Sequence, residues 1–155
     1  MNKLIEKAVE EARKTMNNNI GGPFGALITD ENNNIISIAS NTVLRDHDPT
    51  AHAEVNAIRK AGKVLKTHDL SNCKLYTTSY PCPLCLSAII WSNIKQIYYG
   101  AEVEDVAKIG FRDDYIYNFI KKSNKNSKIL KIEKVESKES IDLLKEYKKK
   151  NKEMY

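Results

Sequence analysis

The sequence contains few cysteines and no long apolar run. It has only three cysteines in 155 residues, and two of them are spaced as C-x-x-C. This usage excludes a disulfide framework and favours metal binding in a reducing compartment. No apolar run approaches the length of a membrane-spanning helix, and the first residues lack the basic-then-apolar order of a signal peptide. We therefore expect a cytoplasmic protein that does not bind a membrane.

Internal repeats and linker-like segments are also missing, so we expect residues 1–155 to form a single domain with a buried core. The formal net charge of +5 is unevenly placed, because lysines crowd the last third of the chain between Lys121 and Lys152. Such a basic strip could bind RNA. Glutamates are interspersed, however, and the aromatic residues typical of nucleic-acid patches are not interleaved. We interpret the strip as a solvated helix face and expect no nucleic-acid partner, with RNA binding left open as the alternative.

Hydrophobic periodicity predicts helices that alternate with strands. The expected helices are residues 4–16, 52–65, 82–91, 115–120 and 140–150. The expected strands are residues 24–29, 35–39, 73–78, 97–99 and 128–135, with a loop at 41–50 and a polar stretch at 102–114. The first two strands form a hairpin through a turn-rich segment. This order implies an α/β sandwich with a mixed five-stranded sheet, mostly parallel beyond the first strand.

Two short motifs contain the residues best suited to catalysis: H-A-E at residues 52–54 and P-C-P-L-C at residues 81–85. Together they supply one imidazole and two thiolates, and catalytic zinc sites use three protein ligands where structural sites use four. Residues three apart at the start of a helix share a face, so Cys82 and Cys85 can bind one ion together with His52. We predict one Zn²⁺ per chain, which would lower the pKa of a bound water to about 7.

The two motifs match the H-x-E…P-C-x-x-C signature of the zinc nucleobase deaminases. In that chemistry Glu54 would take a proton from the water, pass it to a ring nitrogen and protonate the departing amine. Alone, Glu54 would be interpreted as a first-turn acid favoured by the helix dipole. The C-x-x-C alone could be a redox dithiol or half of a zinc knuckle. The absence of a second cysteine pair and the presence of H-x-E favour catalysis.

Four other residues of chemically versatile types are assigned to the scaffold. Cys73 lies in an expected strand and is interpreted as a small core residue. Trp91 follows an apolar helix face, so we expect core packing rather than substrate stacking. His47 and His68 lie in polar stretches and are expected at the surface.

With these residues in hand, the chain resembles the cytidine deaminase-like superfamily, and within it the small bacterial guanine deaminases. The resemblance extends over nearly the whole chain and rests on residues 21–26 (G-G-P-F-G-A), 48–54 (D-P-T-A-H-A-E), 110–117 (G-F-R-D-D-Y-I-Y) and the final Tyr155. It implies a three-layer α/β/α sandwich. It also implies a zinc-dependent hydrolase that converts guanine, a small purine base, to xanthine and ammonia.

The same resemblance implies a set of substrate contacts. Phe24 would stack on the purine, Asn41 and Asp113 would hydrogen-bond its edges, and the main chain at Ala53 would contact the base near the metal. Asp113 suits this role, because an ionised carboxylate accepts hydrogen bonds and guanine presents N–H donors. The alternatives for these side chains are a core Phe, a turn-forming Asn and a helix-capping Asp.

The resemblance further implies a homodimer that exchanges a C-terminal segment, here about residues 136–155, so that Tyr155 closes the partner's pocket. A frayed terminus is the alternative for any chain end. Two positions depart from the pattern. Tyr80 stands where the family commonly has Glu, so a proton-transfer role cannot be carried over to it, and Arg112 stands where an acid is often found.

Three other functions stay open at the level of sequence. The first is a tRNA adenosine deaminase, which would share the fold and the metal ligands. The second is a deaminase of another small substrate, such as cytosine, guanosine or an aminotriazine. The third is a non-enzymatic domain that zinc only stabilises.

Overall fold

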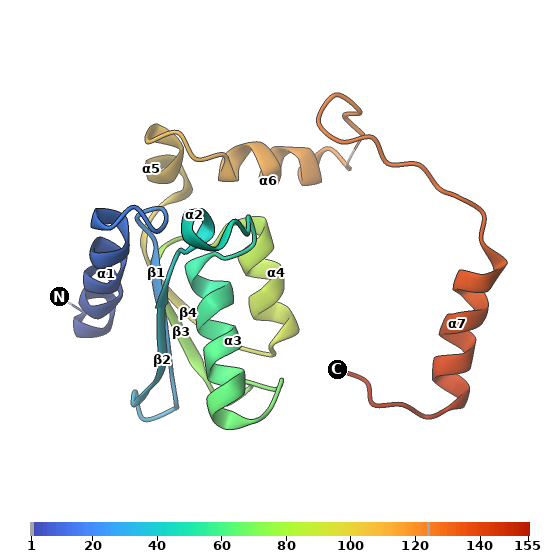
Figure 1. Cartoon of the computed structure of the whole chain (residues 1–155), viewed down its shortest axis with the longest axis horizontal. Coiled ribbons are helices and arrows are strands. Elements are labelled where there is room, and N and C mark those ends of the chain that lie inside the picture. The colour runs from blue at the N-terminus through green and yellow to red at the C-terminus, as the bar shows by residue number, and fades with distance from the viewer. Residues whose placement is uncertain (1, 124) are drawn as a thin grey trace. The chain divides into compact units, whose positions relative to one another are not determined.

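The computed structural model describes residues 2–123 and 125–155 (Figure 1). They divide into two compact units, the first ending at Tyr117 and the second running from Asn118 to Tyr155. The first unit contains the sheet and every candidate site residue except Tyr155. The expectation that residues 1–155 form a single domain stays a prediction.

The elements follow the expected order, with two short additional helices. The helices are α1 (Lys3–Asn17), α2 (Val43–Asp46), α3 (Ala53–Leu65), α4 (Pro83–Trp91), α5 (Val103–Lys108), α6 (Asp113–Lys121) and α7 (Lys138–Lys149). The strands are β1 (Gly25–Thr29), β2 (Ile35–Ser40), β3 (Lys74–Ser79) and β4 (Gln96–Ala101). None of the described helices has the length and apolar content needed to span a bilayer.

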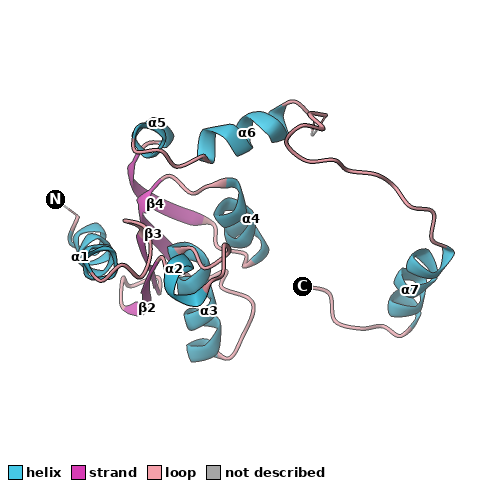
Figure 2. Cartoon of the chain, turned by 45° about the horizontal axis from the view of Figure 1, so that its top comes forward, coloured by secondary structure: helices cyan, strands magenta, loops and turns pink. Residues whose placement is uncertain are grey.

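The first unit is a three-layer sandwich, as predicted, with α1 on one face of the sheet and α3 and α4 on the other (Figures 1 and 2). All five residues of β1 are buried, because both faces of this central strand are covered. Side chains alternate along it: Ala26 and Ile28 pack with Ala57 of α3, and Leu27 packs with Ala8 of α1. The layers therefore form from the alternation that the sequence displays.

The sheet has four described strands in the order β2-β1-β3-β4, so the prediction of a fifth strand at residues 128–135 is wrong. Leu130, Ile132 and Val135 are 54%, 63% and 82% exposed. Lys131 forms an ion pair with the nearby Glu133. Alternation of apolar and charged residues does not make a strand unless a second strand pairs with its backbone.

The sheet is mixed, as expected, and the three strands beyond the first run in one direction. β1 pairs antiparallel with both β2 and β3, and only β3 and β4 pair in parallel. The strands that flank β1 do run in the same direction as each other, as expected for a crossover through α3, but they are not neighbours because β1 lies between them.

The assignments of individual scaffold residues are correct with one exception. Cys73 is buried in the core between the sheet and α3, and His47 and His68 are exposed. Trp91 is 68% exposed, so the prediction of core packing for it is wrong. α4 is apolar around most of its circumference, and Cys85 and Ile89 occupy its buried side. An apolar run of this kind does not reveal which face a helix buries.

Candidate metal centre and substrate pocket

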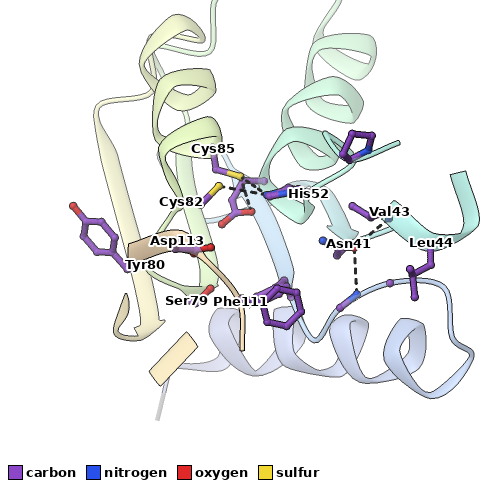
Figure 3. Close-up of a pocket in the computed structure, with 15 residues that line it drawn as sticks. Asn41, Val43, Leu44, His52, Ser79, Tyr80, Cys82, Cys85, Phe111 and Asp113 are labelled. Carbon is purple, nitrogen blue, oxygen red and sulfur yellow. Dashed lines mark hydrogen bonds between the residues drawn. The ribbon is translucent and has the colours of Figure 1, made fainter. Parts of the chain in front are cut away.

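The three predicted metal ligands all lie at helix N-termini. His52 is the N-cap residue of α3, Cys82 is the N-cap residue of α4, and Cys85 lies in the first turn of α4. Pro83 follows Cys82 as the first helical residue, a position where the missing N–H costs little. Because α4 follows the carboxyl end of β3, the ligands gather beyond that end of the strand, where ligands commonly bind in α/β folds (Figure 3).

The structure brings the three donor atoms together. Nδ1 of His52 lies 3.4 Å from the Sγ atoms of both Cys82 and Cys85. All three candidate ligand atoms lie within 4.8 Å of one another. Zinc bonds of about 2.3 Å to sulfur and about 2.1 Å to nitrogen place tetrahedral ligands about 3.6 Å apart. The spacing of these side chains therefore fits a single zinc ion.

The pKa values of the two thiols, Cys82 and Cys85, are both shifted by their surroundings. The neighbouring Cys85 thiol, aided by His52, lowers the pKa of Cys82 to about 4. The proximity of Cys82, together with burial and the charge of Glu54, raises the pKa of Cys85 well above its usual value. The two thiols thus lie close enough for each to change the pKa of the other. Metal binding requires both thiols to be deprotonated, so the donor set suits a divalent ion.

Glu54 lies in the first turn of α3 and is almost completely buried, with 5% of its surface exposed. Its Oε1 accepts a hydrogen bond from Thr77 Oγ1 at 2.9 Å, and its Oε2 accepts one from the Cys85 thiol at 3.3 Å. Burial raises the pKa of this carboxyl. A carboxyl that is hydrogen-bonded beside the metal ligands, with a raised pKa, is suited to both accept and donate a proton.

These groups line a pocket of about 300 Å³ in the first unit. That volume is at the lower end of the range for small-molecule sites. Glu54 and the three metal ligands form one part of its wall, and Phe24, Asn41 and Asp113 form others. The sequence-predicted side chains therefore meet in one cavity that is large enough for a single base.

Asn41 is held in a fixed orientation at the pocket wall. Its Oδ1 accepts hydrogen bonds from the main-chain N–H groups of Gly22 at 3.2 Å and Val43 at 3.1 Å. With the oxygen engaged, its NH₂ group is the part that can donate to a ligand. A Cβ atom on Gly21 would lie 2.1 Å from the carbonyl oxygen of Asn41, so only glycine fits there.

Asp113 is the first residue of α6 and is half-buried, and burial raises the pKa of its carboxyl, with a further contribution from the Cys82 charge. The Phe24 ring packs edge-on against Phe111, with ring centres 4.9 Å apart.

Ala53 is fully buried and its side chain does not line the pocket, so a contact from it would come through its main chain. Tyr155 lies in the second unit and is 76% exposed, and its role at a pocket stays a prediction.

Tyr80 also lines the pocket, but its ring points away from Cys82 and His52 (Figure 3). It packs edge-on against Tyr99, with ring centres 5.1 Å apart, and more loosely against Tyr117. Glu54, and not Tyr80, is therefore the side chain that lies beside the candidate metal ligands.

Sequence reasoning missed three residues of the site. Thr77 and Ser79 are buried near the carboxyl end of β3, and Phe111 packs on Phe24. Thr77 and Ser79 alternate with Thr78 along the strand, so period-2 patterning places them on one face together with Leu75. A hydroxyl on the core face of a strand, directly before a metal motif, is the signal that could have identified them.

The zinc-binding region of cytidine and deoxycytidylate deaminases, as a family profile, matches residues 1–101. The chain belongs to this family. All three metal ligands and Glu54 lie within the matched residues, which confirms the resemblance inferred from the motifs.

Relatives of the chain include several deaminases. It is 49% identical to the guanine deaminase of Bacillus subtilis over 119 residues, which is 77% of this chain and 76% of that protein. The crystal structure of a guanine deaminase from the same species superposes with a TM-score of 0.91 at 41% identity, covering 100% of this chain and 99% of the other. The tRNA-specific adenosine deaminase of Buchnera aphidicola (subspecies Schizaphis graminum) is 39% identical over 68% of this chain and 70% of its own length.

Proposed function

We propose that this protein is a zinc-dependent guanine deaminase, which hydrolyses guanine to xanthine and ammonia. One observation supports this function above all others. His52, Cys82 and Cys85 meet at bonding distance for a single ion, and the buried carboxyl of Glu54 faces the same pocket of about 300 Å³. Similarity to guanine deaminases over the full length of the chain narrows the substrate to guanine.

The chain's own side chains account for the proton transfers. The chemistry that zinc supplies at such a site is a water molecule acidified to a pKa of about 7. Glu54 would take a proton from the attacking water, whose oxygen bonds to the carbon that bears the amine, and would give that proton to the adjacent ring nitrogen. It would then take the second proton from the new hydroxyl and give it to the amine as the C–N bond breaks, so that ammonia leaves and the carbonyl of xanthine forms. Thr77 holds one oxygen of Glu54, so the carboxyl keeps its orientation through both transfers.

The pocket wall accounts for the choice of base. Asp113 can accept hydrogen bonds from the N–H donors of guanine, and the Asn41 NH₂ group can donate to one of its acceptors. The Phe24 ring would pack against the purine. Adenine lacks the N–H donor at N1 and would leave a half-buried carboxylate unpaired, which is costly. This pairing favours guanine over adenine.

Ammonia release from a panel of substrates tests this function. We expect turnover of guanine, and turnover of adenine and cytosine at least about 100-fold lower in kcat/KM, because a mismatched polar edge costs that much or more. Guanosine has the same edge as guanine, so its turnover reports whether the pocket also accepts a ribose. An adenosine-containing anticodon stem-loop should not react. The similarity to a tRNA-specific adenosine deaminase makes RNA the one alternative worth including. Turnover of the RNA without turnover of guanine would contradict the proposal.

We further propose that two copies form a homodimer in which residues from about 136 to 155 of each chain bring Tyr155 to the partner's pocket. α7 buries none of its residues, and its Leu143 and Leu144 are 65% and 72% exposed. An amphipathic helix with its apolar side uncovered favours a partner surface. A pocket completed in this way would close over a free base and exclude an RNA strand.

Mixed dimers distinguish exchange between subunits from closure within one chain. Glu54→Gln removes the proton carrier from a chain but leaves its tail intact. Tyr155→Ala removes the tail tyrosine from a chain but leaves its proton carrier intact. If the tail acts in the partner's pocket, co-expression of the two variants restores guanine turnover well above the sum of the separate proteins. Light scattering should give the mass of a dimer. A monomeric protein with full activity, or a mixture no more active than its parts, would contradict the exchange.

The two cysteine ligands favour a location in the cytoplasm, because a metal centre needs both thiols reduced and the cytoplasm keeps thiols reduced. We propose this location on that ground. Fractionation of cells should recover the protein with soluble cytoplasmic markers, and recovery with exported proteins would contradict it.

A further inference from the structure

Asp113 belongs to a segment, residues 110–117, that is separate in sequence from the metal-binding loop, residues 80–82, which ends at the candidate ligand Cys82. Phe111 and Asp113 both line the pocket, and α6 begins at Asp113. Tyr117 lies four residues further along the same helix, so it shares a helical face with Asp113. Both residues therefore face the side of the unit that holds the metal ligands (Figure 3 shows Asp113 beside Cys82).

Tyr117 contacts the metal-binding loop directly. Its hydroxyl donates a hydrogen bond of 2.6 Å to the carbonyl oxygen of Pro81, the residue before the metal ligand Cys82. Pro81 is fully buried. In the part of the chain that the structure describes, no second hydrogen-bond donor to this carbonyl is found. Burial raises the pKa of Tyr117 to about 12, so the phenol keeps its proton and remains a donor at neutral pH.

At its other end the segment is held by the packing of Phe111 and by a main-chain hydrogen bond of 3.0 Å from the Gly110 N–H to the carbonyl oxygen of Ala107. Phe111 meets Phe24 edge-on, and the preceding Gly110 has a φ of +99°, a conformation that glycine adopts readily. An edge-on aromatic contact restrains the segment but does not fix its height above the pocket. The hydrogen bond from Tyr117 is directional, and it links the helix of Asp113 to the loop of Cys82.

We infer that Tyr117 is a positioning residue for substrate recognition: its hydrogen bond to the Pro81 carbonyl sets the distance between Asp113 and the metal centre, and so matches that distance to the length of one purine. This inference rests on the proposed guanine deaminase function. Tyr117 itself does not line the pocket and touches no reacting atom. Its effect reaches the base through Asp113.

The inference predicts a separation of binding from chemistry. Tyr117→Phe keeps the ring and its packing against Tyr80 but removes the hydroxyl. Asp113 should then bind the base less well, and KM for guanine should rise by about tenfold, the effect of losing one well-placed hydrogen bond. Glu54 and the ligand side chains are unchanged. The kcat value should therefore stay within about twofold of wild type, with the same zinc content.

The matched control is Tyr115→Phe, which removes a phenol hydroxyl from the same helix, where Tyr115 is 42% exposed and packs its ring against Arg112. It should leave KM unchanged. A double-mutant cycle then tests the route through Asp113. Asp113→Asn should raise KM by itself, and adding Tyr117→Phe to it should raise KM no further, because the two residues act as one unit.

Each outcome decides the inference. Equal KM values for wild type and Tyr117→Phe, or additive effects of the two substitutions in the cycle, would overturn it while leaving guanine deamination in place. A fall in zinc content and kcat with KM unchanged would show instead that Tyr117 supports the metal loop alone. A zinc-loaded wild-type protein that does not turn over guanine would overturn the proposed function, and this inference with it.

Discussion

Replacing Glu54 with glutamine is expected to lower kcat for guanine by about a thousandfold, because the residue carries both proton transfers and each acid–base contribution is typically about 10²–10⁴-fold. The amide has nearly the same shape as the carboxyl and can still accept the hydrogen bond from Thr77, so the fold should persist. The three metal ligands are untouched. Ammonia release, measured beside zinc content per chain, checks the prediction.

The companion variant Thr77→Val should have a smaller effect of the same kind. It removes the hydroxyl that holds Oε1 of Glu54 at 2.9 Å and keeps the volume of the side chain. We expect a fall in kcat of about tenfold with KM unchanged, the size of one lost hydrogen bond to a charged group. Glu104→Gln, on the exposed first turn of α5, is the control for loss of a carboxyl and should retain full turnover. Unchanged turnover in Glu54→Gln would leave the proposed mechanism without its proton carrier.

Replacing Cys85 or Cys82 with alanine is expected to reduce bound zinc from about one ion per chain to almost none, since a catalytic site has only three protein ligands to lose. Stability should fall with the metal. A ligand held at about 1,000 times its dissociation constant stabilises a folded protein by about 4 kcal/mol. A strong chelator should lower the melting temperature of the wild-type protein, and should change that of Cys85→Ala far less.

Cys73 provides the control, because it is buried but lies away from the two motifs in the core between the sheet and α3. Cys73→Ala removes one thiol and should leave zinc content and turnover as they are, with at most a modest loss of stability from the small cavity. If Cys85→Ala and Cys82→Ala both kept one tightly bound zinc ion, the assignment of these thiols as ligands would be wrong.

Much of the candidate site could be predicted from sequence, because the relevant groups are close together within short motifs. Residues 52–54 and 81–85 contain the three candidate metal ligands and the proposed proton carrier, and the preference of cysteine and histidine for zinc is a property of the side chains themselves. The helices and strands that position them follow from local periodicity. The layered fold follows in turn, because β1 is apolar on both faces.

Long-range pairing decided the rest. Residues 128–135 alternate as a strand does, but the described sheet contains no partner for them, since a strand exists only where another supplies its hydrogen bonds. Trp91 lies on α4, which is apolar around most of its circumference. Only the packing of α4 against α3 decides that Cys85 and Ile89, and not Trp91, are buried.

The sequence by itself determined the chemistry of this protein, because the ligand atoms and the acid are identified by residue type and spacing. Only the tertiary structure decided which other side chains hold these residues in place around the pocket. The hydroxyl of Thr77 reaches Glu54 across 23 positions, and that of Tyr117 reaches Pro81 across 36. Contacts between residues so far apart depend on where whole elements pack, and no local pattern in the chain encodes them.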